Sequence, residues 1–144
     1  MGLREIEGAL HARFATLGYA YVAYPNGPKV EPPAYSMNFS LFTIYGDTLA
    51  AGLGHEALDR HQGIFQVTVR CPLNDSFGNP AGTYALNAAL DAVRAAFAKG
   101  TSLGYPAAAP THYVHCQVPT ARHLGNLGDG WYTAVVRVPF TQDD

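Results

Sequence analysis

A chain of 144 residues, 48% of them apolar and only 14% charged, is long enough for one domain with its own hydrophobic core. The formal net charge of −2 and the lack of any basic run disfavour nucleic-acid binding, so no sequence-specific nucleic-acid partner is expected. No apolar stretch approaches the roughly 20 residues that span a bilayer, and the N-terminus lacks a signal-peptide core, so we expect no membrane and synthesis in a cytoplasm.

The first part of the chain predicts a helix, a strand and a loop. Apolar residues recur every three or four positions between residues 3 and 17, which places them on one helix face: Leu3, Ile6, Leu10, Phe14 and Leu17. Gly18 follows, at the position where a helix end tolerates a left-handed backbone. Residues 19–25 predict a short strand, and four prolines within residues 25–33 predict a loop.

Two further strands follow, separated by a long connection. Residues 34–45 alternate apolar and polar side chains, but Phe42 and Ile44 make the outward face apolar at its end. A partner contact and an overlying loop both explain this end. Residues 46–59 predict a loop of about fourteen residues, a length that is commonly functional or disordered. Residues 63–71 predict a strand with four inward side chains: Phe65, Val67, Val69 and Cys71.

The second half of the chain predicts one helix and two strands. Asn79 and Pro80 are typical of a helix start, and Lys99 with Gly100 is typical of a helix end. The apolar face of this helix comprises Leu86, Ala89, Leu90, Val93 and Phe97. We expect a loop over residues 101–111, and strands over residues 112–118 and 131–140. The inward residues of the last strand are Tyr132, Ala134, Val136, Val138 and Phe140.

The order α-β-β-β-α-β-β predicts an α+β fold, with a mixed, mainly antiparallel sheet of about five strands and two helices packed on one face. We expect a single domain over residues 1–144, because no repeat and no linker divides the chain. Cys71 and Cys116 each alternate with valines, which predicts buried free thiols; a disulfide between adjacent strands is the alternative.

No residue pattern favours catalysis or a cofactor over a structural role. His112, His115 and Cys116 lie close in sequence, but a strand would point His115 away from the other two, which disfavours a metal site. Residues 55–61 hold an acid–base combination on paper, within the expected loop: His55, Glu56, Asp59 and His61. The glycines of residues 125–130 have neither the spacing nor the following helix of a phosphate-binding loop, and they predict a turn.

The chain resembles the phage tail terminator-like proteins, a family of minor tail proteins similar to the lambda tail terminator. Four segments carry the resemblance: IEGALHARFATL at residues 6–17, RHQGIFQVTVRCP at 60–72, AFAKGTSL at 96–103 and GDGWYTAVVRVPF at 128–140. The order and spacing of these segments are more specific than any one of them. The NDSFGNPAG segment and the histidine-rich strand at residues 112–118 depart from the family pattern.

The resemblance implies a non-enzymatic structural protein of the phage virion. Such proteins form a six-membered ring on the head-proximal end of the tail tube, stop tube polymerisation and offer a surface for head joining. The implied partners are further copies of the chain, the major tail tube protein and the head–tail connector protein. The resemblance implies no cofactor and no metal, and it implies synthesis in the cytoplasm of a bacterial host.

Two groups of residues are candidates for ring or tube contacts. The first lies in the long loop and comprises Asp47, Thr48, His55, Glu56, Asp59 and Arg60. The second lies outward on the strands and comprises Gln66, Thr68, Arg70, Trp131, Thr133 and Arg137. The low charge content fits either a partner-covered surface or a neutral one, and the alternative to both groups is a mobile loop and a solvated sheet face.

Three other functions are open at this point. A different neck or tail-completion protein would join head to tail without limiting tube length. A small metal-dependent hydrolase would use histidines drawn from His55, His61, His112 and His115. A small-ligand binding module is the third alternative, although no pocket signature is visible in the sequence.

Overall fold

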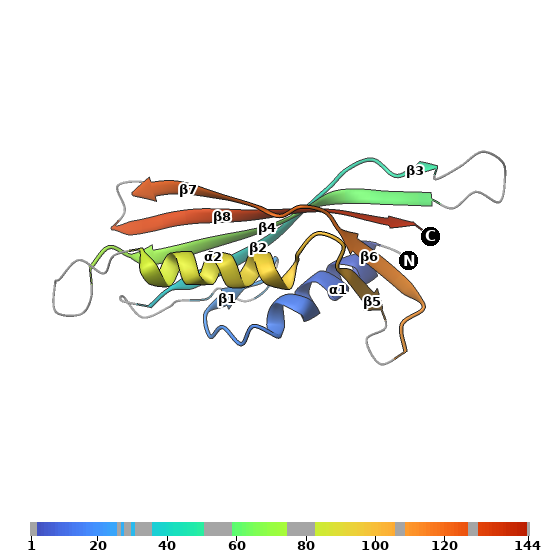
Figure 1. Cartoon of the computed structure of the whole chain (residues 1–144). Helices are drawn as coiled ribbons and strands as arrows, with labels where there is room; N and C mark the ends of the chain where they lie inside the picture. The colour runs from blue at the N-terminus through green and yellow to red at the C-terminus, as the bar shows by residue number, and fades with distance from the viewer. Residues whose placement is uncertain are drawn as a thin grey trace.

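The computed structural model describes residues 3–25, 27, 30, 36–50, 59–74, 83–105, 109–126 and 130–143. It has the α+β fold that the sequence predicts, with two helices and one mixed, mostly antiparallel sheet (Figure 1). The helices are α1 (Leu3–Ala15) and α2 (Tyr84–Ala96). The strands are β1 (Val22–Ala23), β2 (Asn38–Tyr45), β3 (Leu49–Ala50), β4 (Asp59–Pro72), β5 (Ser102–Tyr105), β6 (His112–Cys116), β7 (Thr120–Asn126) and β8 (Trp131–Asp143).

The sheet is larger than the predicted five strands. Its described strands run in the order β1-β2-β4-β8-β6-β5, while β3 pairs with β4 and β7 pairs with β8. Only the short β1–β2 pair is parallel among these pairs. The prediction missed β3, β5 and β7 because each lies in a glycine-bearing or short segment without a clear apolar alternation. Their strand character comes from pairing with distant residues.

Strands β4 and β8 form the long centre of the sheet. Their antiparallel register is continuous from Arg60 opposite Asp143 to Pro72 opposite Trp131. Strand β4 begins four residues earlier than predicted, so residues 59–62 belong to the sheet and not to the preceding loop. The other edge of β8 is shared, since β7 pairs with its first half and β6 with its second.

Helix α1 buries the predicted face. Ile6, Leu10 and Phe14 are at most 1% exposed, whereas Leu3 is 47% exposed at the helix end, contrary to the prediction. Gly18 follows with a φ of 73°, the left-handed conformation expected there. The Nε of Arg13 donates a 2.9 Å hydrogen bond to the carbonyl oxygen of Ala96, the last residue of α2. This bond joins the two helices and places a cation at a helix C-terminus.

Helix α2 also buries its predicted apolar face, which comprises Leu86, Ala89, Leu90, Val93 and, just past its end, Phe97. The predicted start at residues 79 and 80 lies outside the described residues. The helix ends at Ala96, before the predicted end at Lys99 and Gly100. Gly100 has a φ of 86° and lies in the following turn, where the backbone N–H of Thr101 donates a 3.0 Å hydrogen bond to the carbonyl oxygen of Ala98. Figure 1 shows α1 and α2 on the same side of the strands.

The hydrophobic core lies between this side of the sheet and the helices. Phe65, Val67 and Val69 of β4 are fully buried, and Ala134, Val136 and Val138 of β8 lie beside them. The sequence predicted both sets from their alternation. The core cluster also contains Cys71 and Cys116, which are buried free thiols as predicted. No helix within the described residues is long and apolar enough to cross a membrane.

Candidate assembly surface

The side of the sheet away from the helices, here called the outer face, is formed by the alternate residues of each strand. In β4 these residues are Arg60, Gln62, Ile64, Gln66, Thr68 and Arg70, and in β8 they are Trp131, Thr133, Val135, Arg137, Pro139 and Thr141. The inward residues between them fill the core, so the alternation fixes which side chains face outward. The outer face therefore contains seven residues that the sequence proposed as contacts: Arg60, Gln66, Thr68, Arg70, Trp131, Thr133 and Arg137.

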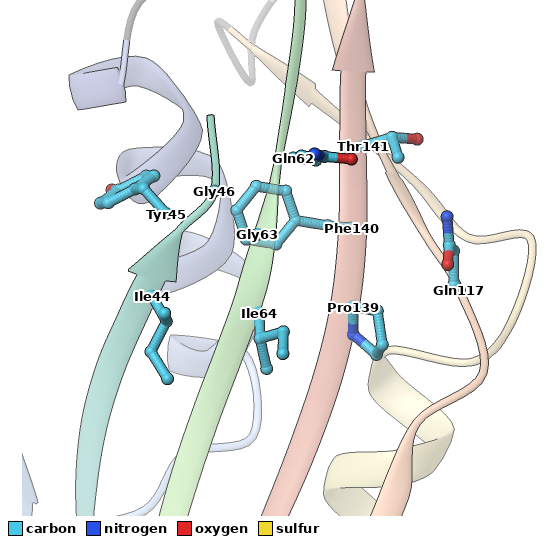
Figure 2. A pocket seen from close by; sticks show the side chains of 10 residues that line it. All are labelled: Ile44, Tyr45, Gly46, Gln62, Gly63, Ile64, Gln117, Pro139, Phe140 and Thr141. Atoms are coloured by element: carbon cyan, nitrogen blue, oxygen red, sulfur yellow. The ribbon is translucent and has the colours of Figure 1, made fainter. Parts of the chain in front are cut away.

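The middle of the outer face is apolar. Ile44, Ile64 and Pro139 form a row across β2, β4 and β8, with the helices behind the strands (Figure 2). Phe42 lies on the same side of β2 and is 56% exposed, while Ile44 is 44% exposed. We call Phe42, Ile44, Ile64 and Pro139 the apolar strip. Among the described residues, no loop covers Phe42 and Ile44.

A shallow hollow lies beside the apolar strip. Its volume is about 300 Å³, and its lining joins part of the apolar strip to polar side chains, among them Gln62, Gln117 and Thr141 (Figure 2). Gln117 comes from the bend between β6 and β7, where its backbone N–H donates a 2.8 Å hydrogen bond to the carbonyl oxygen of Pro139. The hollow is open, and Tyr45 is the titratable residue of its lining, which contains no histidine, cysteine, aspartate or glutamate among the described residues.

The part of the outer face that contains Arg137, Arg70 and Trp131 is polar and basic. The Nε of Arg137 donates a 3.2 Å hydrogen bond to Oε1 of Gln66 on the neighbouring strand. The guanidinium of Arg70 lies 5.1 Å from the ring centroid of Trp131, within the range of a cation–π contact. Trp131 is therefore half-buried beside an arginine, whereas the sequence suggested an isolated exposed aromatic.

Thr133 shares this face but is only 5% exposed, and its neighbour Val135 is 6% exposed. Both lie on the central strand β8, with β4 on one side and β7 on the other; Val135 stands between Thr68 and Arg122 in the register. Long side chains on flanking strands cover a central residue of this kind. Thr133 is thus the least accessible of the outward candidates.

The connection between β2 and β4 was predicted as a loop over residues 46–59. Its two ends instead pair as strands, with Leu49 opposite Arg60 and Ala50 opposite Asp59. Asp47, Thr48 and Arg60 are exposed, and Thr48 Oγ1 lies 3.2 Å from His61 Nδ1. The predicted contacts His55 and Glu56 lie outside the described residues, as does the side chain of Asp59.

The histidines of β6 are separated by the strand alternation, as the sequence indicated. Nδ1 of His115 lies 2.9 Å from Ser102 Oγ, and Nδ1 of His112 lies 2.9 Å from Thr111 Oγ1. The part of the chain that the structure describes contains no group of three histidine, cysteine or acidic side chains that could hold a metal ion. Each of these two histidines instead contacts a nearby hydroxyl.

One titratable cluster was not found from the sequence. The hydroxyl of Tyr45 donates a 3.3 Å hydrogen bond to Oε2 of Glu7, joining β2 to α1. Burial, with Glu7 nearby, raises the pKa of Tyr45 to about 12. His11 Nε2 lies 3.7 Å from Glu7 Oε1, too far for a hydrogen bond, and burial lowers the pKa of His11 although Glu7 opposes this. The Glu7–His11 spacing of four residues was the available signal.

Comparison with known proteins gives one match that spans nearly the whole chain. A family model described as "Phage tail terminator protein" matches residues 5–140 of the 144 residues. No curated protein matches the chain. The matched range contains both helices apart from the first two residues of α1, and it contains the apolar strip and the basic part of the outer face.

Proposed function

This chain belongs to the phage tail terminator protein family, and from that premise we propose that it caps the head-proximal end of the tail tube as a ring and stops tube polymerisation. Members of this family are structural proteins of the phage tail, so the chain is a virion component. The observation that carries the proposal is the match over residues 5–140, which includes the sheet and both helices.

The proposed ring is made of copies of this chain, six in the closed form. A ring requires a heterologous contact, in which one patch of a subunit binds a different patch of the next. Exposed apolar residues on separate elements support such a contact. Leu3 of α1 is 47% exposed, Tyr113 of β6 is 45% exposed, and Leu124 of β7 is 41% exposed.

The ring would meet two further proteins, the major tail tube protein below it and the head–tail connector protein above it. Asp47, Thr48 and Arg60 lie in or beside the short β3–β4 pair and are candidate contacts, together with the sequence-predicted His55, Glu56 and Asp59. The exposed residues of the outer face supply the second set. We further propose that the chain is made in the bacterial host cytoplasm and acts without a cofactor.

Tail length tests this function directly. Negative-stain electron microscopy would compare lysates of the phage with this protein present, absent and added back. Overlong tubes without heads in its absence, restored to one length on adding it back, are the expected result. Tails of normal length that fail to join heads would instead identify a neck protein, and intact phage in all samples would contradict the structural role.

Oligomeric state gives a second measurement. The purified protein would be examined by analytical ultracentrifugation alone and by electron microscopy on tail tubes. A ring on the tube end is expected; a monomer in free solution is compatible with closure on the tube as a template. Single copies scattered along the tube wall, with its end left bare, would contradict capping.

A further inference from the structure

We propose that the outer face binds a partner protein of complementary chemistry, namely an apolar segment bordered by acidic side chains. This inference rests on the proposed function only for the identity of the partner, which would be the tail tube protein or the head–tail connector protein. The binding chemistry itself follows from the composition of the face.

Four of the nine cationic residues of the chain lie on the outer face. Arg60 and Arg70 of β4, Arg122 of β7 and Arg137 of β8 share it, although they are distant in sequence. Asp143 is the register partner of Arg60 at the end of this face, and its side chain lies outside the described residues. No other aspartate or glutamate lies on this face among the described strand residues. The formal net charge of the whole chain is −2, and these four arginines contribute +4. All other residues together therefore carry a net charge of −6. An anionic partner is therefore favoured on this face and not elsewhere.

The apolar strip indicates that the anionic partner is a protein and not DNA. Phe42 and Ile44 are large, apolar and about half exposed, and Phe42 lies in the same row as Gln66 and Arg137. A nucleic-acid interface is polar and dominated by phosphate contacts, which would leave these side chains without an apolar partner. Exposed aromatic and arginine side chains around an apolar centre are instead typical of protein–protein interfaces.

The two helices of a second copy do not offer the complementary surface. The acids of its helices, Glu5, Glu7 and Asp91, alternate along the chain with cations, as the sequence of both helices shows. Arg4 and Arg13 lie on α1, and Arg94 lies on α2. A contact between the outer face and either helix would bring arginines together as well as pairing them with acids, so neither helix of a second copy is a complementary surface.

The test measures binding of the full-length chain to two purified probes from the same phage. The probes are tail tubes assembled without this protein, used in co-sedimentation, and the head–tail connector protein, used in titration calorimetry. The outer-face variants are Phe42→Ser and Arg137→Glu. The matched controls are Tyr84→Ser and Arg94→Glu, which make the same changes at exposed positions of α2. All four positions are exposed, and circular dichroism would verify the fold.

With at least one probe, each outer-face variant is expected to bind about tenfold more weakly than the wild type, while both controls bind normally. Wild-type binding should weaken as salt increases, and Arg137→Glu should reduce this salt dependence. If the outer-face variants bind both probes as well as the controls do, the inference is wrong. A short DNA duplex serves as a third probe; wild-type binding to it that both outer-face variants lose would overturn the protein partner.

The tail-length assay separates this inference from the proposed function. In one outcome, the wild type and both outer-face variants restore tail length equally, and the variants bind the probes as the wild type does. That outcome would support the proposed function and contradict the inference. Failure of the wild type to restore tail length would remove the proposed function. Binding of either probe through the outer face would still support the inference in that case.

Discussion

The ring of Phe140 on β8 lies against the backbone of Gly63, its register partner on β4. A Cβ atom at Gly63 would overlap the carbonyl oxygen of Ile44 and would lie 2.9 Å from Cζ of Phe140. Phe140 is 1% exposed and belongs to the core. The absence of a side chain at residue 63 therefore allows three strands to pack closely beside the hollow.

Gly63→Ala is expected to destabilise the protein by about 3 kcal/mol, because a backbone oxygen and a buried ring must both move. The matched control is Gly8→Ala in α1, where the added Cβ would lie 3.7 Å from Cε2 of Tyr105, an ordinary contact. That change should stabilise the protein by about 0.5–1 kcal/mol, since alanine favours a helix. Urea unfolding measures both changes, and equal effects of the two would contradict the close approach.

Arg70→Met removes the cation above Trp131 and keeps much of the apolar stem. The expected loss is about 0.5–1 kcal/mol of stability, together with a changed emission spectrum, because Trp131 is the single tryptophan of the chain. Arg122→Met on the same face is the control, as its register neighbour is Val135. Identical emission from the wild type and both variants would show that Arg70 does not contact the indole in solution.

His11 should make the protein less stable in mild acid. Because burial lowers the pKa of His11 in the folded state, the unfolded chain takes up the proton first as pH falls. The contribution of His11 is then fully present above the unfolded pKa of about 6.5 and is lost as pH falls below that value. His11→Phe keeps a ring beside Tyr24 and Phe65 and should reduce the fall in melting temperature between about pH 7.5 and pH 5.

The exposed His112 provides the control for this measurement. His112→Phe should leave the pH dependence of the melting temperature as it is in the wild type. An unchanged pH dependence in His11→Phe would mean that the side chain is solvated in the folded protein.

Both cysteines should be unreactive in the folded protein. Burial raises the pKa of Cys71, and it raises the pKa of Cys116 to about 11 although Arg13 opposes this. The reactive thiolate is therefore scarce near pH 8, and access is also restricted. A disulfide reagent such as DTNB should modify both thiols quickly in guanidinium chloride and slowly in buffer. Rapid modification of either thiol in buffer would contradict its burial.

The sequence by itself determined the elements that local periodicity specifies. The spacing of Ile6, Leu10 and Phe14 identified the buried face of α1, and the alternation of Phe65, Val67 and Val69 identified the buried face of β4. Each pattern is informative because an apolar side chain must be removed from water whichever partner covers it. The outward position of Phe42 and Ile44 followed from the same alternation.

The tertiary structure alone decided what depends on pairing between distant segments. Strands β5 and β7 carry weak local signals, and they form because β6 and β8 supply their backbone hydrogen-bond partners. The burial of Thr133 and the contact between Arg70 and Trp131 depend on which strands flank β8. Four arginines that form no run in the sequence meet on one face because strand alternation and register place them there. Periodicity thus selects the side of each strand, whereas register selects its neighbours.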